Sequence, residues 1–516
     1  MIARLVLALA VVASNGSVSL VGVYPNPATD GDAGEYVLLG SNGETSLEGY
    51  ALTDGEDTVA LPATRIDGTV AITDDPRVAA SIANETTVVV DHGLSLANGG
   101  ESVHLLRDGD PVSTLTYGRA PTAEVWDGTT WCPLGATDLP VATAHSVPVT
   151  AFALPDGPTV PAAHLDGADE RIVLAGYTLT STAVADRLLA AHRRGVRVSV
   201  LVDESPVGGT PASQITTLNR LAAAGIEVTA SGGERARYQH HHAKYAVVDD
   251  AVLVTSENWK PAGVGGRASR GWGVVVHDQA LADHLGAVFA ADAGGLDGQP
   301  WPEDPSPGQP DTLADGTYPS RFEPVRTNTD RVRVIVTPDN AERELRGLLD
   351  GATESIRIQQ VSVDEDGPLL EAAIAAARRG VSVRLLLGSA WYVEGDNAAL
   401  AANLTRLAGE EDLPLSVKLA EPRSRYDHLH VKGVLVDRKH AVVGSLNWNR
   451  HALRENREVA VIVTDDGVGR YYTRLFRADW RGAAWRIHWT TLGAIVIAGL
   501  AVVRYANTFD FEPPER

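Results

Sequence analysis

Two short stretches of the chain combine histidine and lysine with aspartate, serine and asparagine in the same order. The first contains His242, Lys244, Asp249, Ser256 and Asn258, and the second contains His430, Lys432, Asp437, Ser445 and Asn447. A spacing of two on a β-strand places the histidine and the lysine on one face, and it does the same for the serine and the asparagine. Each stretch therefore predicts a hairpin that presents imidazole, ammonium, hydroxyl and amide groups to one place.

This set of groups suits the cleavage of phosphate esters. A neutral imidazole can attack phosphorus and form a phosphohistidine, while a second imidazole protonates the leaving oxygen. The reaction needs two histidines, and His242 and His430 supply them. The lysines can neutralise charge on the non-bridging oxygens, and the asparagines can donate hydrogen bonds to these oxygens in the transition state. This chemistry requires no metal and no other cofactor.

The two stretches lie in longer segments that repeat each other. Asp166-Gly-Ala-Asp-Glu-Arg-Ile-Val-Leu leads to AHRRGVRVSVLVD at 191–203, and Asp350-Gly-Ala-Thr-Glu-Ser-Ile-Arg-Ile leads to AARRGVSVRLLLG at 376–388. Both segments read as strand, helix, glycine cap and buried strand, with the caps at Gly195 and Gly380. A second helix and the histidine strand follow in each copy. We predict two α/β repeats at 150–297 and 326–482, joined by a linker rich in Pro and Asp at 298–325.

The duplicated pattern HxKxxxxD…GSxN resembles the signature of the phospholipase D superfamily, over about residues 150–482. The resemblance implies a pseudo-two-fold pair of α/β repeats with one site at their interface. It implies that His242 and His430 are the nucleophile and the general acid. It also implies that four residues hold the phosphate, namely Lys244, Lys432, Asn258 and Asn447. Supporting roles fall to Ser256 and Ser445, and mainly structural or orienting roles to Asp249 and Asp437.

The two copies differ in ways that leave the roles of the histidines open. The second copy carries Arg454-Glu-Asn-Arg-Glu458, where the family places a carboxylate that orients a catalytic histidine, and the matching stretch of the first copy is Arg270-Gly-Trp272. In the first copy, Thr255 also replaces the glycine of the GSxN motif. Family precedent makes His242 the nucleophile, whereas the position of Glu458 beside the second motif favours His430. The neighbouring run His240–His242 is interpreted as flanking polar residues rather than as a metal site.

The segment before the repeats has a different character. Residues 19–145 alternate short β-type runs with turns of Gly, Asn and Asp and lack a long amphipathic helix, which predicts a β-sandwich. The stretch from Val21 to Pro62 resembles the start of a lamin-tail domain, an immunoglobulin-like module. That resemblance implies a role in binding or spacing and no chemistry, and the sequence does not identify what the sandwich binds.

The two ends of the chain predict export and anchoring. Residues 1–14 place Arg4 before an apolar run that ends in small residues, as in a secretory signal peptide. Residues 487–503 contain no Asp, Glu, Lys or Arg and are flanked by arginines and aromatic residues, which predicts a C-terminal transmembrane helix. Arginines before this helix favour a cytoplasmic catalytic part, but large domains translocate largely regardless of charge. We therefore predict a protein of the cell membrane with one C-terminal anchor and an extracytoplasmic catalytic part.

The composition limits the partners of the chain. Sixty-six acidic and 44 basic residues give a net charge of −22, and the acids are scattered rather than gathered in a block. This surface is typical of a halophilic protein, since salt screens its self-repulsion. Cys132 is the only cysteine, which excludes an internal disulfide and a zinc site built on cysteines.

Together these patterns predict a phosphodiesterase or phosphatidyltransferase that acts on membrane phospholipid, as phospholipase D and cardiolipin synthase-like enzymes do. One alternative is an exported, metal-independent nuclease, because the same superfamily cleaves DNA and lamin-tail modules can accompany exported nucleases. The net charge disfavours it, since duplex binding favours a continuous basic groove. The other alternative is a non-catalytic protein that binds phosphate or a surface. It rests on the altered first motif, and the retention of His242, Lys244 and Asn258 argues against it.

Overall fold

The computed structural model of the chain describes residues 17–27, 34–74, 86–89, 95–137, 139–233, 236–295, 297–422, 424–482 and 498. The predicted signal peptide at 1–14 lies outside these residues. So does the predicted transmembrane helix at 487–503, except for residue 498. Across the described ranges, no helix combines the length and the apolar character needed to cross a membrane.

The N-terminal part consists of two β-sheets with a common core, which is the two-sheet arrangement expected from the sequence. Side chains from both sheets, among them Val23, Val37 and Leu105, pack into one buried cluster. The resemblance to lamin-tail and immunoglobulin-like modules stays a prediction. The sheet orders are β10-β9-β1-β2-β5-β6 and β4-β3-β7-β8. The strands are β1 (Val18–Tyr24), β2 (Tyr36–Ser46), β3 (Tyr50–Thr53), β4 (Thr58–Ala60), β5 (Arg65–Thr73), β6 (Thr86–Val89), β7 (Glu101–Arg107), β8 (Asp110–Tyr117), β9 (Glu124–Trp126) and β10 (Trp131–Pro133).

The rest of the described chain forms one continuous sheet of 16 strands, in the order β18-β14-β13-β12-β15-β16-β17-β11-β19-β26-β25-β24-β20-β21-β22, with β23 paired to β17. The strands of the first repeat are β11 (Ala142–Leu154), β12 (Arg171–Gly176), β13 (Arg197–Asp203), β14 (Glu227–Ser231), β15 (Tyr245–Val248), β16 (Ala251–Thr255), β17 (Ser269–His277) and β18 (Gly298–Pro300). Those of the second are β19 (Val325–Val336), β20 (Ser355–Gln360), β21 (Ser382–Leu387), β22 (Leu415–Leu419), β23 (His428–Leu429), β24 (Gly433–Val436), β25 (His440–Gly444) and β26 (Val459–Thr464).

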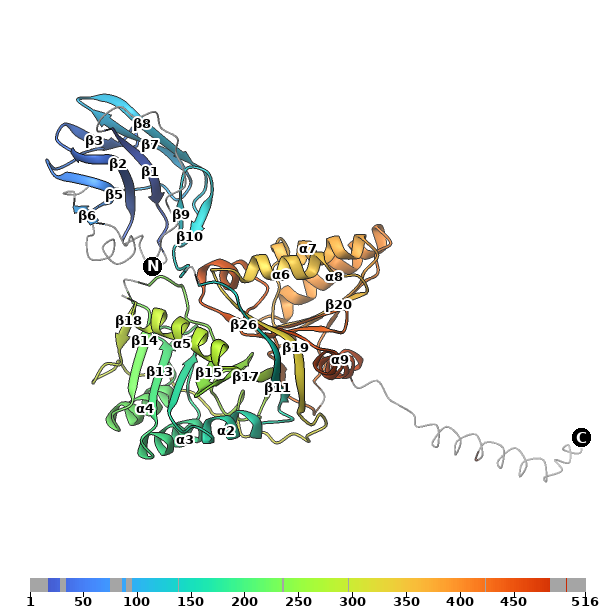
Figure 1. Ribbon diagram of the computed structural model, residues 1–516. Coiled ribbons are helices and arrows are strands. Elements are labelled where there is room, and N and C mark those ends of the chain that lie inside the picture. Colours follow the sequence, from blue (N-terminus) through green and yellow to red (C-terminus); the bar gives the residue numbers. More distant parts are fainter. Residues whose placement is uncertain are drawn as a thin grey trace, which may run out of the picture.

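The two repeats have the same topology and meet along the antiparallel pair β11–β19 at the centre of the sheet (Figure 1). Three helices of each repeat pack in an outer core, and the fourth helix of each packs in a central core that both repeats share. The outer helices are α2 (Thr159–Asp166), α3 (Thr182–Arg193) and α4 (Ala212–Ala223), and in the second repeat α6 (Ala341–Asp350), α7 (Pro368–Arg378) and α8 (Glu394–Glu410). The central helices are α5 (Gln279–Ala293) and α9 (Asp466–Arg481).

Local sequence signals explain where these helices begin and end. Asp278 and Asp465 cap α5 and α9, each accepting a hydrogen bond from a backbone N–H three residues on. Gly195 and Gly380, after α3 and α7, have φ angles of 94° and 93°, which confirms the glycine caps expected there. Each glycine turns the chain back so that the next strand enters the sheet parallel to the previous one.

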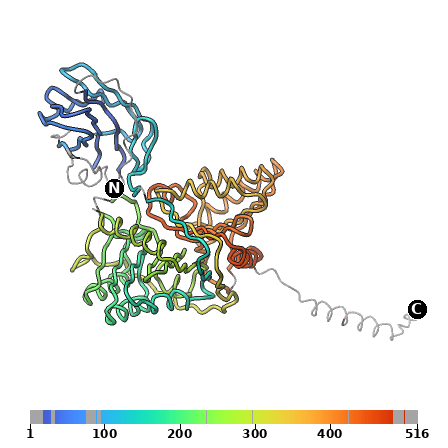
Figure 2. The backbone as a smooth tube through the Cα atoms, viewed as in Figure 1, coloured from blue at the N-terminus to red at the C-terminus, as the bar shows by residue number. Residues whose placement is uncertain are grey.

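The domain boundaries differ from the expected ones at two places. Strand β11 starts at Ala142, so the last residues assigned to the β-sandwich already belong to the central sheet, where they pair with β19. Strand β18 lies in the stretch assigned to the linker and pairs with β14. The tube in Figure 2 shows the linker that follows it running back to the start of β19. Both strands were missed because their partners lie far away in the sequence.

The β-sandwich is joined to the second repeat by a buried carboxylate that pairs with two partly exposed arginines. Glu124 of β9 is fully buried and pairs with Arg450 at 3.2 Å and with Arg454 at 3.4 Å. Arg450 directly precedes, and Arg454 lies within, a π-helical turn, His451–Glu455, that leads to Glu458. The sandwich therefore contacts the segment that carries a candidate site residue.

Candidate active site

The sheet topology brings the histidine strands to the carboxyl ends of the parallel strands in both repeats. Residue Ala175, near the end of β12, pairs with Tyr245, the residue after Lys244. In the second repeat, Gln359 of β20 pairs with Gly433, the residue after Lys432. The carboxyl edge of parallel strands is the usual place of ligand sites in α/β sheets.

The first histidine is held by a carboxylate of the other repeat. His242 Nδ1 lies 2.7 Å from Oε1 of Glu458, whose side chain is fully buried. The backbone N–H of His242 also donates to the carbonyl oxygen of Arg457 at 2.9 Å. The contact with Glu458 fixes the ring and leaves its Nε2 available for chemistry, and the backbone contact fixes the strand.

The second histidine has a related but longer contact, which is not a direct hydrogen bond. His430 Nδ1 lies 3.4 Å from Oε2 of Glu257, which belongs to the first repeat and is 2% exposed. The backbone N–H of His430 donates to the carbonyl oxygen of Arg270 at 2.9 Å. The two repeats thus exchange carboxylates, and neither histidine is oriented without the other repeat.

This exchange corrects the expected position of Glu458 and adds a residue that the sequence interpretation missed. Glu458 contacts His242 and not His430, because the segment before β26 pairs with the histidine strand of the first repeat. In the first repeat, a Cβ on Gly271 would lie 2.2 Å from Cγ of Glu257, so Glu257 fills the space that this glycine leaves. A signal was present, since the pair Glu257 and Gly271 corresponds to Leu446 and Glu458 in the second copy.

Both lysines of the motifs are buried beside the histidines. Lys244 is fully buried, Lys432 is 3% exposed, and each Nζ donates to the carbonyl oxygen of the histidine two residues before it. Lys244 Nζ also lies 5.3 Å from the centre of the Tyr177 ring. An ammonium group held by one carbonyl and one ring retains donors for an anionic ligand.

The other motif residues divide into two groups. The side-chain oxygens of Asn258 and Asn447 are buried and accept no hydrogen bond from any described residue. In contrast, the hydroxyls of Ser256 and Ser445 accept hydrogen bonds from the backbone N–H of Trp272 and of Val459, both at 3.1 Å. Each serine therefore ties its loop to the facing strand, in keeping with the supporting role that the resemblance implies.

The aspartates of the motifs lie at the opposite edge of the sheet. Asp249 stands in the turn between β15 and β16 and accepts three hydrogen bonds from the backbone N–H groups of residues 169–171. Asp437 does the same for residues 353–355 in the second repeat. Each aspartate ties its hairpin to the preceding strand, which agrees with the structural role that the resemblance implies.

The three consecutive histidines have three different partners. His240 Nδ1 lies 3.6 Å from Asp203, His241 Nε2 lies 3.1 Å from Asp292, and His242 contacts Glu458. Within the described part of the chain, no group of three or more His, Cys, Asp or Glu side chains is arranged to hold a metal ion. His242 is thus the candidate site residue of the run, and His240 and His241 are polar residues with acidic partners of their own.

A buried arginine cluster supports each histidine strand. Arg457 of the second repeat binds Asp292 at 2.8 Å and lies over the ring of Tyr238 at 4.6 Å, both in the first repeat. The related cluster joins Arg270 of the first repeat to Asp479 at 3.3 Å and to the ring of Tyr426 at 4.8 Å, both in the second. The loss of one partner from such a buried pair typically costs about 3–5 kcal/mol. The clusters are positioning elements that hold the repeats together at the site.

Burial and the lysines set the protonation states of the site. Burial, together with Lys244 and Lys432, holds the pKa of His242 well below its usual range. The same causes, opposed by Glu257, lower the pKa of His430 to about 3. Burial raises the pKa of Glu458 to about 7 and lowers that of Lys432 to about 8. Both imidazoles are therefore neutral in the free protein, as a nucleophile requires.

These pKa values predict a narrow pH optimum. Below about 7, Glu458 becomes protonated and no longer accepts the Nδ1 proton of His242, so kcat/KM rises with pH through this value. Above about 8, Lys432 loses its charge, so kcat/KM falls. A pH profile of kcat/KM measures both limbs, and Lys432→Arg is expected to move the alkaline limb to higher pH. A profile that stays flat from about 6 to about 9 would contradict these assignments.

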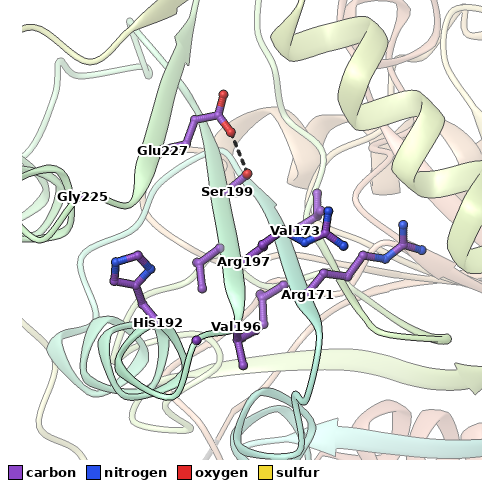
Figure 3. A pocket seen from close by; sticks show the side chains of 11 residues that line it. Arg171, Val173, His192, Val196, Arg197, Ser199, Gly225 and Glu227 are labelled. Carbon is purple, nitrogen blue, oxygen red and sulfur yellow. Dashed lines mark hydrogen bonds between the residues drawn. The ribbon is translucent and has the colours of Figure 1, made fainter.

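A large cavity lies away from this chemistry. It has a volume of about 580 Å³, and its lining includes Arg171, Arg197 and Glu227, the first residues of β12, β13 and β14 (Figure 3). These residues stand at the amino ends of strands whose carboxyl ends face the histidines. Arg171 pairs with Asp283 at 3.1 Å, and Ser199 donates to Glu227 at 2.8 Å. The cavity is separate from the candidate active site.

Comparison with known proteins identifies the family. The family described as "Cardiolipin synthase, PLD-like domain" matches residues 162–293 and 345–480, which together are more than half of the chain. The chain therefore belongs to the phospholipase D-like family, as the duplicated motif predicted. The matched ranges include both histidines, both lysines and both members of the carboxylate exchange.

Individual relatives match smaller parts of the chain. Mitochondrial cardiolipin hydrolase of Xenopus laevis is 40% identical over 94 residues, which are 18% of this chain and 41% of that protein. Cardiolipin synthase A of Pseudomonas aeruginosa is 33% identical over 132 residues, which are 26% of each chain. This chain thus spans less than half the length of these relatives. The crystal structure of phosphatidylserine synthase from Haemophilus influenzae Rd KW20 shares the fold, with a TM-score of 0.50 and 13% identity over 67% of this chain and 88% of that one.

Proposed function

We propose that the chain is a phospholipase D-type phosphodiesterase or phosphatidyltransferase that acts on membrane phospholipid through a phosphohistidine. The observation that carries the proposal is the exchange of carboxylates, His242 with Glu458 and His430 with Glu257. Two oriented imidazoles between two buried ammonium groups are the groups that phosphodiester cleavage needs.

In the proposed first step, His242 is the nucleophile. Its Nδ1–H donates to Glu458, so the lone pair of Nε2 attacks phosphorus and the bond to the leaving oxygen breaks. His430 donates a proton to that oxygen, and the product alcohol leaves. The anionic phosphodiester offsets the charge of the lysines and so favours the protonated form of His430 in the complex.

In the second step, water or an alcohol attacks the phosphohistidine. His430 takes the proton of the attacking hydroxyl, the P–N bond breaks, and His242 returns to its neutral form. During both steps, Lys244 and Lys432 stabilise the charge on the non-bridging oxygens, and the amides of Asn258 and Asn447 donate hydrogen bonds to them. The residues of this chain thus supply each proton and each charge in the cycle.

Two lines of support favour phospholipid over nucleic acid as substrate. Relatives that match in sequence include a cardiolipin hydrolase and a cardiolipin synthase, and a protein that shares the fold is a phosphatidylserine synthase. The net charge of −22 also disfavours a polyanionic duplex, because duplex binding draws on several phosphate contacts to basic side chains.

The assay that tests this proposal compares substrates directly. The purified chain is mixed with vesicles of phosphatidylglycerol or cardiolipin, or with single- or double-stranded DNA, with and without EDTA and over a range of salt concentrations. We expect release or transfer of a phosphatidyl group, little DNA cleavage, and unchanged activity in EDTA. Activity on DNA alone would favour the nuclease alternative. Activity lost in EDTA and restored by a divalent ion would contradict the mechanism.

A further inference from the structure

Large apolar side chains that face solvent are unevenly distributed over the described residues. Five are exposed, namely Val112 (49%), Val207 (81%), Leu313 (41%), Trp391 (88%) and Tyr392 (51%). Val112 lies on β8 of the β-sandwich, and the other four lie on loops of the catalytic part. Exposing 88% of a tryptophan residue to water is unfavourable, because the ring has a large apolar area that is usually buried in proteins.

Three of these side chains follow equivalent strands of the two repeats. Val207 lies in the loop after β13, and Trp391 and Tyr392 lie in the loop after β21. Both strands end at the edge of the sheet that carries the histidines. The first loop is also tied to the site, because Tyr177 Oη accepts a hydrogen bond from Val207 N–H at 2.5 Å while its ring packs 4.7 Å from that of His242.

The fourth side chain lies on the linker where it passes this edge. Before Leu313, the backbone N–H of Gln309 donates to Thr210 in the loop of Val207 at 2.8 Å. After Leu313, Tyr318 hydrogen-bonds through its hydroxyl to Asp427, three residues before His430. Leu313 thus lies on a segment held at one end by the first loop and at the other end beside the second histidine strand.

We propose that Val207, Leu313, Trp391 and Tyr392 form a docking rim that inserts into the surface of a lipid bilayer around the site. Trp391 and Tyr392 pack edge to face with ring centres 5.7 Å apart, and such aromatic side chains favour the interface between lipid and water. The proposal rests on the proposed function for the identity of the substrate, but the contact itself is measured without turnover.

The charge of the neighbouring residues indicates how the rim binds. Glu204, Asp311 and Glu394 lie on or beside the same three segments, so the rim is acidic as well as apolar. Attraction between basic residues and anionic lipid is therefore not its mechanism. Because binding depends on apolar contact, it is expected to persist or strengthen as salt rises, whereas binding through basic residues would weaken.

Quenching of tryptophan fluorescence by brominated lipid tests whether Trp391 contacts the bilayer. The full chain and its Trp391→Phe variant are mixed with vesicles of phosphatidylcholine and phosphatidylglycerol whose acyl chains carry bromine, which quenches tryptophan on contact. We expect quenching in the full chain at low and high salt, and a clear loss of that quenching in Trp391→Phe. Equal quenching in the two proteins would overturn the proposal, whatever substrate the site takes.

Turnover then separates docking from chemistry. Trp391→Ser is expected to lower kcat/KM on phosphatidylglycerol vesicles by about 10-fold, because it removes a large apolar contact with the bilayer. Val112→Ser, the matched control on the β-sandwich, is expected to stay within about twofold. Both variants should hydrolyse bis(p-nitrophenyl) phosphate, a soluble diester, as the unchanged protein does. An equal loss of Trp391→Ser on both substrates would overturn the docking role. No activity of the unchanged protein on any vesicle would instead refute the proposed function.

Discussion

The variants His242→Ala and His430→Ala are each expected to reduce turnover by about 1,000-fold or more, and the double variant is expected to be little worse than either. The reason is that each histidine is needed in both steps, one as the carrier of phosphorus and the other as the carrier of the proton. Residues that act as one unit do not have additive effects. Steady-state kinetics of the three variants on one phospholipid measure this.

The matched control is His428→Ala, since His428 lies two residues before His430, with ring centres 6.4 Å apart, and has no lysine two residues after it. It should retain activity within about 10-fold of the unchanged protein. Full activity in either His242→Ala or His430→Ala would exclude a site shared by both repeats. About half of the activity in each single variant, with full loss only in the double variant, would indicate two independent sites.

The second large effect concerns Glu257, the carboxylate that the sequence interpretation missed. Glu257→Gln is expected to reduce kcat by about 100-fold with little change in KM, because the carboxylate positions His430 and stabilises its charged form. Protein stability, measured by thermal unfolding, should change much less than turnover, because glutamine keeps the shape of the side chain that fills the space at Gly271.

A second test of Glu257 gives the first repeat the residue types that the second repeat has at the corresponding positions. Glu257→Leu combined with Gly271→Glu gives the first repeat the residues of the second, Leu446 and Glu458, at the corresponding positions. We expect Glu257→Leu alone to lose activity and the combination to recover part of it, together with the pH dependence that Glu257→Leu loses. Full activity in Glu257→Leu would contradict the role of Glu257. Recovery of activity by Gly271→Glu would indicate that a carboxylate at either position serves to orient His430.

The sequence predicted the two α/β repeats and most residues of the candidate site because their signals are local. The spacing of His242 and Lys244 on one strand, repeated at His430 and Lys432, needs only the geometry of a β-strand. The glycine caps at Gly195 and Gly380 likewise depend on a single residue each. Duplication of these signals indicated two α/β repeats, and the paired topology of the 16-stranded sheet agrees with it.

The missed features of the candidate site depend on contacts between the repeats. Glu458 is near the second motif in sequence but contacts His242, because the segment before β26 crosses to the first repeat. Glu257 lies inside the GSxN-like loop, where no sequence pattern marks a functional carboxylate. Its role becomes visible only in the structure, where its side chain fills the space beside Gly271. Arg457 and Arg270 have no local signal either, since each finds its aspartate and tyrosine in the other repeat.

The most direct test of the central claim, one site built from both repeats with His242 as nucleophile, is to map the covalent intermediate. The protein is quenched in alkali during turnover of a phospholipid labelled at phosphorus, and the labelled peptide is sequenced by mass spectrometry. We expect a phosphohistidine at His242, absent from His242→Ala and still formed by His430→Ala from a substrate whose leaving group needs no proton. Phosphate on His430 that survives His242→Ala would reverse the roles of the two histidines and contradict the account.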